Sequence, residues 1–322
     1  MLFNNLRAST ALGLEGYSDF DHFRESERYA RAESIPLAAK DFRVLRAVLA
    51  LPSSTLSLVR TFPRIINGYD FSERLLIVIP MDGICSTRLN GEPVRQSLIL
   101  IKGKANCTVM EPESRLVALL SLRPEMLDRW WPNLINGHLL LQLPPARLSN
   151  LQTLIRNMLE FAALEPVAIA VHGILDRMQN TLFAGLDEAL YAGAFHGRGK
   201  LTSMSSYKTI VDRVDHLLGL NPLDTANERL ADEIGISVRT LQTASQSVCG
   251  LSAHRYSRLR RLWSVRRQLR SGAPGLTVKA SALAHGFWHL SQFTVAYCQA
   301  FGELPSSTLV QAKLSGRAST GW

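Results

Sequence analysis

Seven arginines gather between positions 255 and 270, and no acidic residue lies among them. Guanidinium groups at this density are typical of a surface that binds the phosphates of a polyanion, such as a nucleic acid. The alternative is the solvated face of an ordinary helix. The residues concerned are Arg255, Arg258, Arg260, Arg261, Arg266, Arg267 and Arg270.

The basic charge of the chain is concentrated in this C-terminal part. Of the 36 Lys and Arg and the 27 Asp and Glu in the chain, residues 221–322 hold 12 and 5. One stretch of this part is uncharged, because residues 286–302 contain no Lys, Arg, Asp or Glu. We expect the arginines to contact phosphates, which fixes the position of the protein on the nucleic acid without reading its sequence. The uncharged segment would then be positioned by these contacts and would need no charge of its own.

Motifs of common enzymes are absent from the sequence. It contains no G-x-S-x-G, G-x-x-x-x-G-K-[ST] or G-x-G-x-x-G. None of the eight histidines falls within residues 56–122, where a metal-binding sheet would need clustered His and carboxylate ligands. Cys85, Cys107, Cys249 and Cys298 form no C-x-x-C pair and are expected to be buried free thiols. We expect no enzyme, no metal and no cofactor.

Two different patterns precede the basic part. Residues 56–122 alternate short apolar segments with turn residues, and Asn90-Gly91 is typical of a hairpin turn. These features predict an antiparallel sandwich or a small barrel. From 147 to 190 the apolar residues recur at helical spacing, with Pro166 separating two predicted helices.

Length and composition predict the domain boundaries. A chain of 322 residues is long enough for two or three hydrophobic cores. Residues 192–206 are rich in Gly and Ser and predict a linker between a domain at 1–191 and a helical domain at 207–311, with a tail at 312–322. The N-terminus lacks a signal sequence, and the longest apolar runs fall well short of the ~18 residues of a membrane-spanning helix. We therefore expect a cytoplasmic protein with no membrane partner.

Two segments of the helical domain share one plan. Residues 228–250 and 279–302 each predict a short helix, a glycine, and a longer helix that ends at a second glycine. In the first segment Gly235 suits a left-handed turn and Ser237 suits the cap of the next helix, while Gly286 takes the turn position in the second segment. The result is two helix-turn-helix units, whose second helices have the geometry that fits a major groove ~12 Å wide.

A connecting helix is predicted between the two units, at about 254–270, where it carries the arginines and spans roughly 25 Å. Major grooves on one face of DNA recur every ~34 Å, so the two second helices would enter successive grooves on either side of this helix. In the second unit Phe293, Tyr297 and Phe301 recur at i, i+4 and i+8. This spacing predicts a buried stripe rather than rings that stack on bases.

The two units resemble the AraC/XylS family of bacterial transcription regulators over about 206–311. The second unit fits the family signature A-x3-G-F then F-x3-[FY]-x3-F-G-x2-P, and the first fits L-A-x3-G-x-S-x3-L with a G-x-S segment after it. The resemblance implies an α+β multidomain fold, in which a β-rich, cupin-like N-terminal domain with a helical dimerisation segment precedes an all-α double helix-turn-helix DNA-binding domain. The matching residues are Leu230, Ala231, Gly235, Ser237, Leu241, Gly250, Ser252, Tyr256, Ala282, Gly286, Phe287, Phe293, Tyr297, Phe301, Gly302 and Pro305.

The resemblance also implies contacts to DNA. By position it implies base contacts from Arg239, Gln242 and Thr243, where Arg239 would bond a guanine and Gln242 an adenine. In the second unit, ranked below the first, it implies Leu290, Ser291 and Val295, and exposure at the start of the helix adds His289 and Gln292. Phosphate contacts are expected from Ser237, Arg255, Arg258, Arg260 and Arg261.

Four positions depart from the family pattern. Thr243 stands where Arg is often found, and Ala253 stands where Pro is typical. Ser245 replaces a core aromatic residue, and Ser281 replaces an aliphatic one. Because a polar side chain in an apolar core is costly, Ser245 is expected to loosen the packing of the first unit.

Together these features predict a sequence-specific regulator that binds double-stranded DNA as a homodimer, with RNA polymerase as a partner. Activation is the commoner outcome in the resembling family. The N-terminal domain either senses a small-molecule effector, which no motif names, or only dimerises or binds a protein partner. Trp130 and Trp131 either line a pocket or close the sheet against the helices, and closure is the favoured interpretation.

Overall fold

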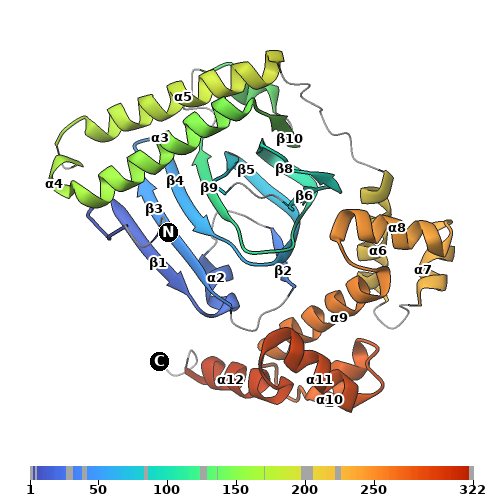
Figure 1. Ribbon diagram of the computed structural model, residues 1–322. Coiled ribbons are helices and arrows are strands. Elements are labelled where there is room, and N and C mark those ends of the chain that lie inside the picture. The colour runs from blue at the N-terminus through green and yellow to red at the C-terminus, as the bar shows by residue number, and fades with distance from the viewer. Residues whose placement is uncertain are drawn as a thin grey trace. The chain divides into compact units, whose positions relative to one another are not determined.

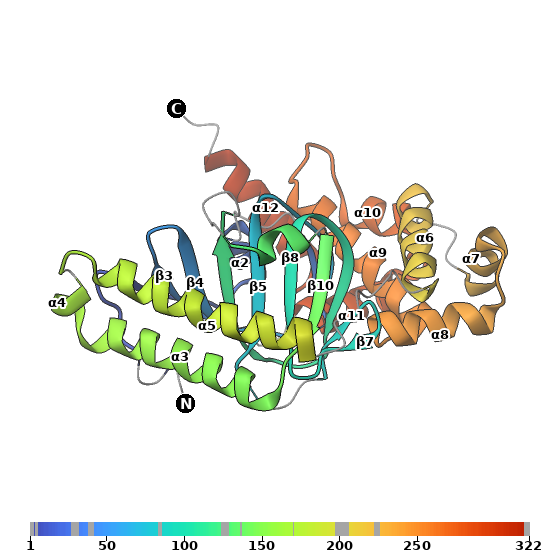
Figure 2. The same cartoon turned by 90° about the horizontal axis from the view of Figure 1, so that it is seen from above.

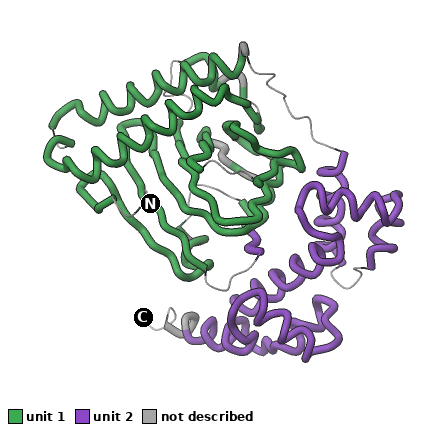
Figure 3. The backbone as a smooth tube through the Cα atoms, viewed as in Figure 1, with its two compact units in different colours: residues 1–34, 42–203 green, residues 35–41, 204–322 purple. Residues whose placement is uncertain are grey.

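Two compact units make up the computed structural model, and each is described by itself (Figure 3). The first unit comprises residues 1–34 with 42–203, and the second comprises residues 35–41 with 204–322. The first is built on a β-sheet and the second consists mainly of helices (Figure 1), which confirms the predicted fold class. The structure describes Phe3 and residues 6–26, 32–37, 42–82, 86–123, 129–135, 137–169, 171–196, 206–221 and 226–318. Most of the predicted linker and Cys85 lie outside these residues.

The sheet has ten described strands, in the order β1-β3-β4-β9-β5-β8-β6-β7, with β10 paired to β8 and β2 paired to β5. Its central pairs are antiparallel, as predicted. Pairing also extends beyond 56–122, because β1 to β3 precede that range and β10 follows it. The strands are β1 (Leu12–Tyr17), β2 (Glu33–Pro36), β3 (Val44–Ala50), β4 (Ser54–Arg60), β5 (Arg64–Pro80), β6 (Arg88–Leu89), β7 (Glu92–Pro93), β8 (Ser97–Glu111), β9 (Leu116–Leu122) and β10 (Gly137–Gln142).

Turn and bulge residues shape this sheet. Asn90 and Gly91 connect β6 to β7 with φ values of 53° and 89°, which confirms the predicted hairpin turn. The pairing of the long strands β5 and β8 shifts register between Asn67 and Tyr69, where Gly68 has a φ of 64°. A bulge of this kind bends the strand, so the sheet is able to curve around one of its faces.

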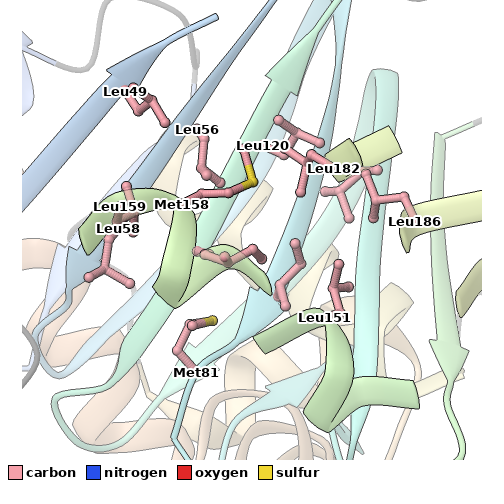
Figure 4. Close-up of a cluster of buried hydrophobic side chains, with 14 of the residues drawn as sticks. Leu49, Leu56, Leu58, Met81, Leu120, Leu151, Met158, Leu159, Leu182 and Leu186 are labelled. Atoms are coloured by element: carbon pink, nitrogen blue, oxygen red, sulfur yellow. The ribbon is translucent and has the colours of Figure 1, made fainter. Parts of the chain in front are cut away.

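Two long helices cover the other face of the sheet. Helix α3 (Pro145–Leu164) begins with Pro at its first position, and α5 (Ile174–His196) lies beside it across the strands (Figure 2). The short α4 (Pro166–Ile169) separates them, and α2 (Phe20–Ser26) lies earlier in the chain. Strand residues such as Leu56 and Leu120 pack with helix residues such as Leu159 in a fully buried core (Figure 4). Alternation along each strand therefore leaves a second set of side chains on the opposite face.

Trp131 closes the layer between sheet and helices. Its side chain is 2% exposed, and its Nε1 donates to Asp187 Oδ1 in α5 over 2.8 Å. Arg129 forms an ion pair with the same carboxylate. Trp130 is 42% exposed, so the closure interpretation holds for Trp131 alone.

The second unit is a succession of short and medium helices. The connecting helix, predicted at about 254–270, is α9 and spans Ala253–Arg270. The last helix continues to Ala318 and so includes part of the predicted tail. The helices are α6 (Ser206–Leu220), α7 (Asn227–Ile234), α8 (Val238–Cys249), α9, α10 (Val278–Ala284), α11 (Leu290–Phe301) and α12 (Pro305–Ala318).

Candidate nucleic-acid interface

The turn between α7 and α8 has the geometry that its sequence predicts. Gly235 adopts a left-handed conformation with φ 78°, and its N–H donates to the carbonyls of Ala231 and Asp232. Ser237 Oγ then accepts a hydrogen bond from the Thr240 N–H at 3.1 Å, which caps α8. These local bonds fix the angle at which α8 leaves the turn, and they confirm the first helix-turn-helix unit.

Helix α8 has one buried face and one exposed polar face. Arg239, Gln242 and Thr243 are exposed, as their predicted role at base edges requires. The exposed face continues with Gln246, which we did not predict and which the spacing of seven residues from Arg239 would have identified. The opposite face is buried and consists of Leu241, Ala244, Ser245, Val248 and Cys249.

The second helix-turn-helix unit has a similar turn. Gly286 has a φ of 75°, and α11 starts at Leu290. Trp288 and His289 are exposed just before the helix, and Ser291, Gln292, Val295 and Gln299 are exposed on it. Leu290 differs from the other predicted contacts, because its half-buried side chain packs against the hydrophobic core of the unit. This placement favours a packing role for Leu290.

The aromatic stripe of α11 is buried, as predicted. Phe293, Tyr297 and Phe301 are 1%, 0% and 6% exposed. The centroids of the Tyr297 and Phe301 rings lie 4.5 Å apart, and the Tyr297 hydroxyl shares a hydrogen bond with Thr308 Oγ1 at 2.8 Å. Burial raises the pKa of the Tyr297 hydroxyl above its ordinary value. The rings therefore hold α11 in place and are not available to stack on bases.

The arginines of α9 divide into exposed and buried groups. Arg255 and Arg258 are exposed, as phosphate contacts require. Arg260 is half-buried, and its Nε lies 3.1 Å from Asp215 Oδ1 in α6. Arg266 is 6% exposed and forms an ion pair with Glu303. The dense run is thus neither a purely solvated face nor a single phosphate-binding surface.

The structure places Arg261 in a different position from the one expected of a phosphate contact. Its side chain is 9% exposed, and its Nη1 donates to the carbonyl oxygens of Gly286 at 3.1 Å and His285 at 3.3 Å. The guanidinium also lies 4.7 Å from the centroid of the Phe287 ring. Burial lowers the pKa of Arg261, and the nearby charge of Arg258 lowers it further. Arg261 therefore holds the turn of the second unit.

Replacing Arg258 by alanine is expected to lower the salt slope of DNA binding by about 0.9, because one phosphate contact and its released counterion are lost. The slope is obtained from dissociation constants measured across a salt series. Arg123, which is exposed on the first unit, provides the matched control, and its replacement by alanine should leave the slope unchanged. An unchanged slope in Arg258→Ala would assign that side chain to the solvated face.

Ser245 and Ser281 are the two core departures from the family pattern, and both are buried, at 3% and 0% exposed. Neither hydroxyl has a hydrogen-bond partner. Because a buried unpaired hydroxyl is unfavourable, Ser245→Ala should raise the free energy of unfolding by about 1 kcal/mol. Chemical denaturation measures it, with Ser237→Ala as a contrasting variant that loses about 1 kcal/mol with its helix cap. A destabilised Ser245→Ala variant would show that the hydroxyl is satisfied in solution.

The first unit contains a cavity of about 360 Å³, here called the sheet cavity. Its wall is the set of strand side chains on the face opposite α3 and α5, among them Val59, Val78 and Leu119. Phe23 of α2 and Ser34 of β2 also line it. The residues that the structure describes include no cluster of three or more His, Cys, Asp or Glu able to hold a metal ion.

Two helix-turn-helix units, each with an exposed polar face on its second helix and joined by an arginine-rich helix, define a double helix-turn-helix DNA-binding protein. A family model described as a helix-turn-helix domain matches residues 230–311. The XylDLEGF operon transcriptional activator of Pseudomonas putida is 35% identical over 109 residues, which are 34% of this chain and 33% of that protein. The C-terminal domain of this chain is therefore an AraC-type helix-turn-helix domain, similar to that of the P. putida activator.

Two solved structures are also similar to this chain. A probable AraC family transcriptional regulator from Rhodopseudomonas palustris is 34% identical, and the match covers 33% of this chain and 98% of that one, with a TM-score of 0.30. The AraC-like transcriptional activator CuxR is 15% identical, and the match covers 85% and 100% of the two chains, with a TM-score of 0.42. The chain matches only about a third of the length of the P. putida activator.

Proposed function

We propose that the chain activates transcription by placing α8 and α11 in two successive major grooves of its DNA site. The exposed polar face of α8 carries this proposal, since Arg239, Gln242 and Thr243 stand together on it while the opposite face is buried. An arginine on a helix in the major groove bonds two acceptors of guanine, and a glutamine bonds two atoms of adenine. Recognition of the base sequence is therefore assigned mainly to α8.

The remaining contacts follow from exposure. In the second unit His289, Ser291, Gln292 and Val295 are assigned to base edges, and Leu290 is assigned mainly to packing. Phosphate contacts are assigned to Ser237, Arg255 and Arg258, which are exposed. Arg260 keeps a secondary phosphate role, because Asp215 already neutralises part of its charge. Positioning and readout are thus carried by different side chains.

We infer that the active form is a cytoplasmic homodimer that works with RNA polymerase and has no enzymatic activity. Exposed apolar side chains that a partner would cover occur from the end of α3 through α4 to the residues just after it, where Phe161, Leu164, Val167 and Val171 are between 38% and 83% exposed. A patch of this kind supports self-association. Among the residues that the structure describes, no helix combines the length and apolar character needed to span a membrane.

The sheet cavity favours an N-terminal domain that senses a small molecule over one that only dimerises. A volume of about 360 Å³ lies in the range of ligand pockets, and a domain that serves only as a dimer interface does not need it. We propose that an effector in this cavity changes the affinity of the protein for its DNA site or for RNA polymerase.

Transcription in vitro tests the proposed activation directly. A template that carries the selected DNA site upstream of a weak promoter is transcribed by purified RNA polymerase with and without the full-length protein. More transcript is expected with the protein, and at a limiting protein concentration Arg239→Ala should reduce the increase while transcription by RNA polymerase alone is unaffected. Less transcript would make the protein a repressor and overturn the activation.

A further inference from the structure

We propose that α11 selects A·T base pairs, and that Trp288 and Val295 recognise the methyl groups of their thymines. The inference deepens the proposed function and rests on it, because it concerns α11 in a major groove. The part of the DNA site that one reading helix meets is here called a half-element. Helices α8 and α11 lie near opposite ends of α9, so each is assigned its own half-element (Figure 1).

Helix α11 and the residues around it carry no charged side chain. Residues 286–302 contain no Lys, Arg, Asp or Glu, whereas α8 exposes Arg239. In the major groove, Arg and Lys pair with the acceptors of guanine, and Asp and Glu accept from the amino group of cytosine. The side chains that most directly select G·C pairs are therefore absent from the segment that presents α11 to DNA.

The polar side chains of α11 favour an A·T pair. Gln292 is exposed, and glutamine bonds N6 and N7 of adenine. Ser291 is also exposed, but serine bonds more than one base. His289, just before the helix, meets acceptors on both purines and does not decide between them. The most selective polar contact of α11 is therefore the contact from Gln292 to adenine.

Two apolar side chains are exposed in the same segment. Trp288 is 65% exposed and Val295 is 58% exposed. Val295 lies three and four residues after Gln292 and Ser291, so these three side chains share one face of the helix. At the edges of base pairs in the major groove, the apolar group that such side chains can contact is the C5 methyl of thymine. Trp288 and Val295 are therefore suited to thymine.

Packing within the second helix-turn-helix unit does not account for these two side chains. Its hydrophobic core is formed by buried residues such as Phe287, Phe293 and Tyr297, and Leu290 packs against that core. Trp288 and Val295 are both exposed to solvent instead. Exposed apolar surface gains free energy when a partner covers it, so contact with thymine methyl groups would stabilise the complex with DNA.

The spacing on the helix predicts the arrangement of bases. Gln292 and Val295 are three residues apart, which is about 4.5 Å along the helix axis. Successive base pairs are about 3.4 Å apart. The adenine that Gln292 reads and the thymine that Val295 contacts are therefore expected in neighbouring base pairs.

Replacement of thymine by deoxyuridine in the selected DNA site tests the inference, because uracil differs from thymine only by lacking the C5 methyl. The half-element that Arg239→Ala leaves intact is the one assigned to α11. Fluorescence anisotropy with the full-length protein measures each affinity. Uracil at a contacted thymine of this half-element is expected to weaken binding about fourfold, the effect of one methyl group. Uracil in the flanking DNA should have no effect.

Two variants assign the methyl groups to side chains. Val295→Ala and Trp288→Ala should each weaken binding to the thymine site and remove most of the uracil penalty at one position, leaving the penalty at the other. Val310→Ala makes the same change as Val295→Ala at a residue of α12 that is 55% exposed, and it should change neither quantity. Absence of any uracil penalty, or a penalty that both variants retain in full, would overturn the inference.

The selected site separates this inference from the proposed function. A half-element of α11 that consists of G·C pairs, or a site with the half-element of α8 alone, would overturn the inference and leave readout by α8 in place. Recovery of DNA without any motif would refute the proposed function, and the inference would fall with it.

Discussion

Replacing Arg239 by alanine is expected to weaken binding to the specific DNA site by about 1–3 kcal/mol, with little change on random DNA. Arg239 is exposed at the start of α8, and the capped turn before it presents this end of the helix outward. A bidentate bond from a guanidinium to guanine is worth about this much discrimination against other bases. Fluorescence anisotropy with the selected site and with a scrambled duplex measures both affinities at one salt concentration.

Arg239→Lys is the matched control for this result. Lysine keeps the positive charge but lacks the planar fork of donors, so it should lose most of the specific affinity and retain the non-specific affinity. If Arg239→Ala weakened binding equally on both duplexes, the side chain would contact phosphate, and the proposed readout by α8 would lose its principal residue.

Phe293→Ala is expected to lower the free energy of unfolding by about 3–5 kcal/mol, because it leaves a cavity where a buried aromatic ring was. Phe293 is 1% exposed and packs between Phe287 and Tyr297, with ring centroids 5.1 and 5.6 Å away. Chemical denaturation, followed by circular dichroism of the helices, measures the change. The second helix-turn-helix unit should lose its fold before the first.

Val295→Ala provides the comparison on the same helix. Val295 is 58% exposed, so its truncation should change stability by no more than about 0.5 kcal/mol. If Phe293→Ala left stability unchanged and reduced DNA affinity, the aromatic stripe would contact bases and the packing assigned to α11 would be incorrect.

The turns, the caps and the aromatic stripe of the helical unit are predictable from sequence because their signals are local. Gly235 is the residue type that adopts positive φ without strain, and Ser237 lies at the position whose side chain reaches the free N–H groups of the next helix. The stripe at Phe293, Tyr297 and Phe301 depends only on helical spacing. Each feature is set within a few residues of chain.

The separate roles of the arginines depend on packing between distant segments. Arg258 and Arg261 are three positions apart and would lie on neighbouring parts of an isolated helix. Arg261 is buried because the turn at His285 and Gly286 packs over it and offers two carbonyl oxygens. Spacing within 255–270 contains no information about that turn.

Only the part of the sheet at 56–122 was predicted, because the strands outside this range depend on pairing with distant segments. Strand β1 contains Gly13 and Gly16, and glycine weakens the local strand pattern, so pairing with β3 is needed to order it. Alternation along β9 indicates two faces, one with Leu120 and one with Leu119. The sequence does not indicate that the second face surrounds a cavity, because the cavity depends on the bends in β5 and β8. No motif indicates that Arg115 lines this cavity.

Selection of bound fragments from random DNA, by the full-length protein at physiological salt with non-specific competitor, tests the central claim most directly. Two reading helices joined by α9 predict a motif with two half-elements whose centres lie about one helical turn, roughly 10 base pairs, apart. Substitution of Arg239 should relax the sequence of one half-element and leave the other intact. Uniform, salt-sensitive recovery without any motif would show that the arginines bind phosphate while α8 and α11 read no sequence, which contradicts the account.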